Sequence, residues 1–164
     1  MRNRTVLAVV VLLLSPIVPM QPIGATADSA NADIRAFLQK FLMSFDNLDW
    51  PAFQECFSDS ATVFHPAPPN LRRTDSRTQF EKAWLGVFER IKRESGRSSP
   101  PFLELKPEDL QIENLATEVA LVTFHLTKGS VLSRRTLVLK KYPSGWKIVH
   151  IHASNLPFPA DAAH

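Results

Sequence analysis

The stretch RRTLVLKKYPSGWKIVHIHAS, residues 134–154, decides the fold of this chain. Two runs of alternating side chains flank Pro143-Ser144-Gly145, a short segment of residues that favour turns. Such alternation is typical of β-strands, and a joint of this length makes the two strands antiparallel neighbours. The stretch therefore predicts a hairpin, with one strand over 131–142 and the next over 146–154.

Alternation also predicts which side chains share a face of each strand, because residues i and i+2 project to the same side. On the first strand Arg135 shares a face with Leu137 and Leu139, and this more apolar face is expected to point inward. On the second strand strict alternation places His150 and His152 together on one face. A bulge of one residue would invert this assignment.

Three helices and one short strand are predicted upstream of the hairpin. Apolar spacing indicates an amphipathic helix over 33–48. Asp49 has the position of an N-cap before a short second helix, and capping-box spacing in TDSRTQF, residues 74–80, opens a third helix that ends near Glu94. A short strand over 61–65 lies between the second and third helices and ends at a proline-rich segment.

Two further strands are predicted, over 110–114 and 118–127, and short turns join the four C-terminal strands into an antiparallel meander. The economical arrangement for this order is an α+β fold. Three N-terminal helices pack on a strongly curved antiparallel sheet, which forms a half-open cone with a pocket. The expected domain covers 33–154, with a short linker over 28–32 and a flexible tail over 155–164.

The N-terminus has the pattern of a secretory leader. Arg2 and Arg4 precede an apolar run over 6–14, and Ala25-Thr26-Ala27 forms a small-x-small cleavage site. The apolar run is too short to cross a bilayer as a helix. We therefore expect a signal peptide over 1–27, export to the periplasm or the extracellular space, and no membrane span in the mature chain.

The charge of the mature chain argues against nucleic acid as a partner. The chain has 19 Lys and Arg against 16 Asp and Glu, and removal of Arg2 and Arg4 with the leader lowers the formal net charge from +3 to +1. A nearly neutral chain lacks the strong positive charge of a nucleic-acid-binding protein. The densest basic stretch, RIKRESGR over 90–97, is interpreted as the solvated end of a helix, favoured by the helix dipole.

The single cysteine, Cys56, leaves the chain without an internal disulfide. The stability of an exported domain of this size must then come from its hydrophobic core. Cys56 lies between two phenylalanines and is predicted to be a buried, unreactive thiol.

Three segments resemble the SnoaL-like branch of the nuclear transport factor two-like superfamily: ADIRAFLQKFLMSFDNLD, the following WPAFQECFSDSATVF, and the hairpin quoted above. The resemblance implies a conical α+β barrel, often homodimeric, with an apolar pocket between the helices and the inner sheet face. The superfamily includes ketosteroid-isomerase-like enzymes, polyketide cyclases, dehydratases and the association domain of a calmodulin-dependent kinase. It therefore implies a fold rather than an activity.

Arg135 is the first candidate for a ligand-binding residue. An inward-facing arginine needs a partner, because burial of an unpaired charge is costly. It either holds the carboxylate of a ligand or pairs with an internal acid. The internal acids considered are Asp46, Asp49 and Glu118.

The histidines have three interpretations. His150 and His152 line the pocket as ligand contacts, fill space as structural residues, or bind a metal with His125 or His65 as a third ligand. No acid close in the sequence completes a metal site, so we expect neither a metal nor a cofactor. His152 and His65 are the candidates for a catalytic acid or base, since histidine titrates near neutral pH. His65 ends the first strand, where the mouth of a cavity is expected.

Trp84 and Phe124 lie on apolar stripes and are interpreted as core residues or as surfaces on which a ligand stacks. Three functions follow. The first is binding of a small, partly apolar organic molecule, with or without a carboxylate. The second is a cofactor-free acid/base enzyme of isomerase, lyase or cyclase type. The third is a dimerisation or assembly module without a ligand, using an outer patch that includes Leu121, Val149 and Ile151, and in each case we expect a homodimer.

Overall fold

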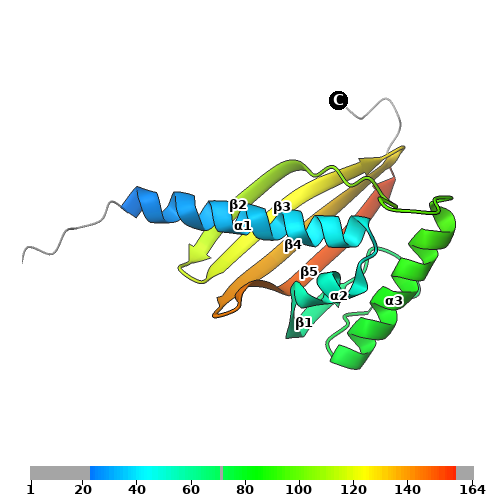
Figure 1. Ribbon diagram of the computed structural model, residues 1–164, viewed down its shortest axis with the longest axis horizontal. Helices are drawn as coiled ribbons and strands as arrows, with labels where there is room; N and C mark the ends of the chain where they lie inside the picture. The colour runs from blue at the N-terminus through cyan, green and yellow to red at the C-terminus, as the bar shows by residue number, and fades with distance from the viewer. Residues whose placement is uncertain (1–22, 71, 158–164) are drawn as a thin grey trace, which may run out of the picture.

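The computed structural model describes residues 23–70 and 72–157 (Figure 1). Most of the predicted leader and the end of the predicted tail lie outside these residues and stay predictions. No helix in the described part of the chain is both long enough and apolar enough to cross a membrane. The elements are α1 (Ile23–Asp46), α2 (Trp50–Glu55), β1 (Phe57–Phe64), α3 (Arg77–Glu94), β2 (Glu108–Ala116), β3 (Val119–Lys128), β4 (Val131–Tyr142) and β5 (Gly145–Pro157).

The strands form one open sheet in the order β1-β5-β4-β3-β2. β1 runs parallel to β5, and the other neighbours are antiparallel. Figure 1 shows α1 lying across the twisted sheet, with α2 below its C-terminal part and α3 beyond its C-terminal end, so that the helices cover one face. The predicted α+β class, with helices packed on a curved sheet that does not close, is confirmed.

The core lies between this covered face and the helices. Phe53 of α2 is fully buried and lies 4.8 to 6.2 Å, centroid to centroid, from six other aromatic rings. Burial of each such side chain stabilises the fold by about 1.5–3 kcal/mol, and edge-to-face ring contacts add to this. The sheet contributes the alternate residues Ala120, Val122, Phe124, Leu137 and Leu139, all buried.

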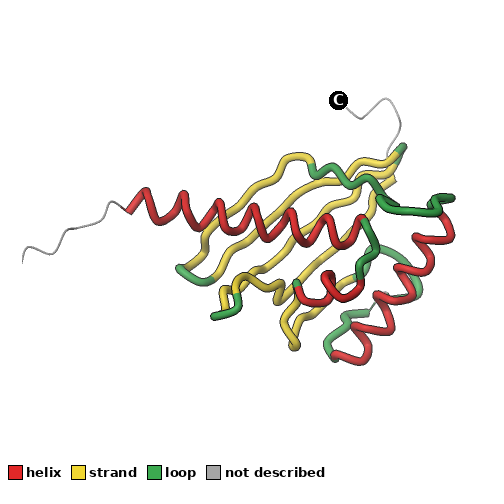
Figure 2. Tube along the Cα trace, in the orientation of Figure 1, coloured by secondary structure: helices red, strands yellow, loops and turns green. Residues whose placement is uncertain are grey.

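The helix ends follow the predicted capping signals. The Asp49 carboxylate accepts a hydrogen bond from Ala52 N at 3.1 Å, and Ser76 accepts one from Gln79 N at 3.3 Å. Asp46, the last residue of α1, fixes the long connection after α3 that Figure 2 shows as a loop. Its side chain accepts from the backbone N–H groups of Leu103 and Glu104 at 3.0 and 2.6 Å.

Two predicted boundaries are wrong. Residues 28–32, predicted as a linker, belong to α1, which begins at Ile23; the alanines in this stretch favour the helix. Residues 155–157, predicted as the start of the tail, extend β5. Their backbones pair with Ser133, Leu132 and Val131, and Ser133 Oγ donates to Asn155 Oδ1 at 2.8 Å.

A bulge in β5 changes which side chains face the core. Leu139 pairs with Ile148 but its neighbour Val138 pairs with His150, so Val149 is one extra residue on β5. Ile148 before the bulge and Ile151 after it are both buried. The strict alternation expected for this strand is therefore wrong beyond Ile148, and Ile151 belongs to the core rather than to an outer patch.

The bulge is tested by placing a charge on either side of β5. We expect Ile151→Lys to lower the free energy of unfolding by at least about 3 kcal/mol, because Ile151 is 3% exposed and the ammonium would have no partner. His152→Lys should change it by less than about 1 kcal/mol, since His152 is exposed. Urea unfolding followed by tryptophan fluorescence measures both. A larger loss for His152→Lys would show that β5 alternates without a bulge.

Candidate ligand-binding site

A cavity of about 860 Å³ lies between the helices and the inner sheet face, beside the loop that follows β1. Protein interiors are close-packed, so a space of this size is not a packing defect, and it falls in the range of small-molecule sites. Most of its wall is apolar. The apolar lining includes Phe41, Leu42, Phe45, Val63, Trp84, Val87, Phe124, Leu126 and Ile151.

The charged side chains around this cavity are almost all basic. Asp75 is the single acid of the lining, and it is paired with Arg73 at 3.0 Å. The other basic residues of the lining form no ion pair with any residue that the structure describes. They are Arg72, Lys82, Arg90, Arg93 and Arg135. The cavity therefore combines an apolar body with an excess of positive charge.

Arg135 lies on the inner face of β4, as predicted, and contributes to the cavity wall. Its guanidinium donates to the backbone oxygens of Arg134 at 2.9 Å and Ser154 at 3.4 Å. Burial lowers the pKa of Arg135 to about 10, which still leaves the group charged at neutral pH. Two neutral carbonyls do not neutralise a guanidinium, so the positive charge on this wall is uncompensated by the described residues.

None of the acids considered as partners reaches Arg135. The Asp46 side chain holds the backbone of the loop after α3, and the Asp49 side chain caps α2. Glu118 is exposed at the turn between β2 and β3. The interpretation of Arg135 as half of an internal ion pair is therefore wrong for these three acids, and the ligand-anchor interpretation remains.

His65 is the histidine of the cavity lining. It is 7% exposed, its ring lies 4.9 Å from the Trp84 ring, and its Nε2 has no hydrogen-bond partner within the described structure. Burial lowers the pKa of His65 to about 4, and the positive charge of Arg90 adds to this effect. The imidazole is therefore neutral at pH 7.

His150 and His152 lie on the outer sheet face. His150 Nδ1 shares a hydrogen bond of 2.7 Å with Thr62 Oγ1, and His152 is exposed beside Phe64, with ring centroids 5.5 Å apart. Burial, then the charges of His152 and Arg73, lower the pKa of His150. The prediction that these histidines line the cavity is wrong because of the bulge at Val149.

Trp84 and Phe124 are buried core residues that also line the cavity, and their role as surfaces on which a ligand stacks stays a prediction. His125 pairs across the sheet with Arg134, away from His65. Within residues 29–70 and 72–157, no three His, Cys, Asp or Glu side chains are grouped so that they could hold a metal ion.

Sequence reasoning missed the basic side chains of α3 as cavity residues. Lys82, Arg90 and Arg93 line the cavity together with Gly86, whereas the stretch from Arg90 to Arg97 was interpreted only as a solvated helix end. The sequence signal is the spacing of these four residues at intervals of four, four and three, which places them on one side of a helix.

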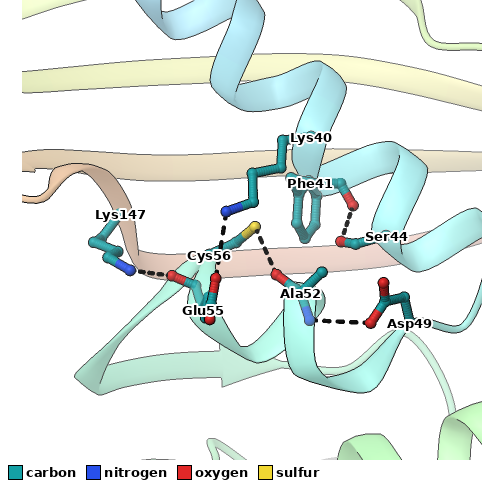
Figure 3. Close-up of polar contacts among 8 residues, drawn as sticks. All are labelled: Lys40, Phe41, Ser44, Asp49, Ala52, Glu55, Cys56 and Lys147. Atoms are coloured by element: carbon teal, nitrogen blue, oxygen red, sulfur yellow. Dashed lines mark hydrogen bonds and ion pairs between the residues drawn. The ribbon is translucent and has the colours of Figure 1, made fainter.

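A second, smaller depression of about 330 Å³ lies beside α1, α2 and β5 and behaves differently. Its basic side chains have partners: Lys40 pairs with Glu55 at 3.4 Å, and Lys147 donates to the Glu55 backbone oxygen (Figure 3). Cys56 donates to Ala52 O at 3.4 Å, and burial raises the pKa of its thiol. These contacts agree with a structural role for Cys56.

The lowered pKa of His65 predicts a pH dependence of stability. Above pH 6.5 the imidazole is neutral in both the folded and the unfolded chain. Between pH 6.5 and about 4 only the unfolded chain binds the proton, so the free energy of unfolding decreases as the pH is lowered. The loss reaches about 3 kcal/mol near pH 4. We expect His65→Gln to reduce the dependence of the unfolding free energy on pH across this window. Equal slopes for the wild type and His65→Gln would contradict the burial of His65. Urea unfolding at several pH values measures these slopes.

Comparisons with known proteins agree with the fold. The model of the SnoaL-like domain family matches residues 34–159. A search of curated proteins found no match to this chain. Similar solved structures include a candidate dehydratase of the NTF2-like family from Streptomyces avermitilis, with 15% identity, a TM-score of 0.63, and coverage of 79% of this chain and 98% of that one.

Two further structures show the same fold in proteins of different description. A candidate ketosteroid isomerase from Parabacteroides distasonis is 20% identical, with a TM-score of 0.55, over 75% of this chain and 85% of that one. The association domain of C. elegans CaMKII is 15% identical, with a TM-score of 0.59, over 77% and 96%. At these identities the likeness concerns the fold alone. The family match over most of the length shows that this chain belongs to the family of SnoaL-like domains.

Proposed function

We propose that this protein is exported and binds a small, partly apolar organic anion in the cavity, with a ligand carboxylate on Arg135. The observation that carries the proposal is the guanidinium of Arg135, which lies on the cavity wall without an acidic partner among the described residues. The leader pattern at the N-terminus supports export.

The physical reason is the cost of leaving the cation unpaired. A charged group removed from water loses solvation free energy, and two backbone carbonyls recover only part of it. A carboxylate would form charge-assisted hydrogen bonds to the guanidinium. The apolar wall around Phe124 and Leu126 would bury the hydrocarbon part of the same molecule. Both parts of the proposed ligand therefore have matching surfaces in one cavity.

A cofactor-free acid/base enzyme is the second candidate, and His65 is the observation that favours it. Its unpartnered Nε2 belongs to the cavity lining, whereas the other predicted catalytic candidate, His152, is on the outer face. A pKa of about 4 makes the imidazole a weak base at neutral pH, so hydrogen bonding to a ligand suits it better than proton abstraction. We therefore rank binding above turnover.

The proposed homodimer would use the outer sheet face. This face carries partly exposed side chains of moderate polarity from four strands. Analytical ultracentrifugation would give the oligomeric state of the protein. The outward side chains include Thr62, Phe64, Leu121, Thr123, Thr136, Val138 and His150. Such a dimer would leave the cavity on the opposite face open to a ligand, so assembly and binding are compatible.

Arg135 and Arg134 provide a matched pair of variants, because they are adjacent but face opposite sides of β4. With decanoate as the probe, we expect Arg135→Met to weaken binding 10- to 100-fold, which corresponds to the loss of a charge-assisted hydrogen bond of about 1.5–3 kcal/mol. Arg134→Met should bind like the wild type. Isothermal titration calorimetry measures the affinities.

Thermal unfolding of the unliganded variants separates binding from folding. Removal of an unpaired charge from the cavity wall should leave the melting temperature of Arg135→Met equal to or above that of the wild type. A large loss of stability would instead show that Arg135 has a structural partner. Equal weakening by Arg134→Met and Arg135→Met would contradict the proposed site.

A further inference from the structure

α3 presents a stripe of cations to the cavity, opposite the wall that holds Arg135. Lys82, Gly86, Arg90 and Arg93 follow each other at intervals of four, four and three residues and all line the cavity. Arg90 donates to the Pro68 backbone oxygen at 3.2 Å, whereas Lys82 and Arg93 are exposed at the mouth. None of these three cations forms an ion pair with a residue that the structure describes.

Gly86 is the unusual member of this stripe. Glycine in the interior of a helix destabilises it relative to alanine, so it usually has a packing reason. A Cβ atom built on Gly86 meets no atom within 4 Å, and the residue lies on the cavity side of the helix. Internal packing therefore does not require a glycine here. Its effect is to leave the helix backbone open to close approach from the cavity, between the side chains of Lys82 and Arg90.

The helix dipole explains only part of this charge. Lys92 and Arg93 lie in the last turn of α3, where a positive charge is favourable. Lys82 is three turns earlier, where the dipole has no such effect, and the acids Glu81, Glu89 and Glu94 of the same helix do not line the cavity. The basic side chains are thus concentrated on the cavity side, and the acidic ones lie elsewhere.

We propose that the α3 stripe is a second anion subsite, and that the ligand is an amphipathic dianion that bridges the cavity from Arg135 on the sheet to the cations of the stripe on α3. This inference rests on the proposed function, because it takes the carboxylate at Arg135 as the first anchor. The second group is a carboxylate or a phosphate, and it lies over the open backbone at Gly86. The hydrocarbon between the two groups contacts the apolar wall.

The test compares straight-chain monocarboxylates with α,ω-dicarboxylates of 8, 10, 12 and 14 carbons by isothermal titration calorimetry. We expect at least one diacid to bind about tenfold tighter than the monoacid of the same length, since two cations contribute modest, partly exposed interactions. The best length reports the separation of the two subsites. ω-Phosphono acids of that length show whether the second group is phosphate-like, because they would then bind tighter than the diacid.

Variants of α3 assign the gain to the stripe. Lys82→Met combined with Arg93→Met should abolish the advantage of the diacid and leave the monoacid affinity unchanged, while Lys92→Met, an exposed neighbour outside the cavity lining, should leave both unchanged. Gly86→Leu should unfold at the wild-type temperature or above, because the space beside it is empty, yet weaken diacid binding.

Three outcomes would overturn the inference. Diacids that bind no tighter than monoacids at any length would exclude the second subsite and leave the proposed function intact. Equal weakening of monoacid and diacid by the α3 double variant would show that the stripe and Arg135 share one anion. Failure of both classes to bind the wild type would overturn the proposed function as well.

Discussion

The extra residue in β5 is the constraint on which the cavity depends. Without the bulge at Val149, strict alternation would point His150 and His152 toward the helices and turn Ile151 and Ala153 outward. The bulge reverses this, so that the small side chain of Ala153 lies beside Arg135 across the β4–β5 ladder and both residues line the cavity. A histidine in place of that alanine would fill part of the space beside the guanidinium. One inserted backbone residue therefore sets both the packing of the core and the room available for a ligand.

The positions of the acidic side chains determine the net charge of the cavity wall. The acids near the core serve the backbone: Asp46 holds the loop after α3, and Asp49 caps α2. Lys40 and Lys141 of the smaller depression form ion pairs, whereas five cations of the large cavity form none with any described residue. A protein selected for stability alone would pair or replace a half-buried arginine such as Arg135, because an apolar residue of similar size often serves as well. The unpaired cations and the empty space beside Gly86 instead fit a site whose partner is a separate molecule.

The sequence predicts the elements of this fold better than the details of its site. Helical spacing, the Asp49 and Ser76 caps and the Pro143-Ser144-Gly145 turn are local signals, and the structure follows them. The inward orientation of Arg135 also follows from alternation, because β4 has no irregularity before Val138. The orientation of His152 does not follow from alternation, since a one-residue bulge cannot be recognised from the composition of a strand. The α3 stripe was visible as spacing, but its meaning requires the sheet on the other side of the cavity, which only tertiary packing supplies.

Native mass spectrometry of the protein purified from its natural host would show whether the cavity holds an organic acid. We predict a protein population with an added mass that is released on denaturation, and the released molecule should carry at least one acidic group. Addition of the released molecule in excess should restore the added mass to protein from which it has been removed. A retained molecule without an acidic group, or a protein that stays bare when exposed to the acid fraction of its host, would show that the ligand of the cavity is not an organic acid.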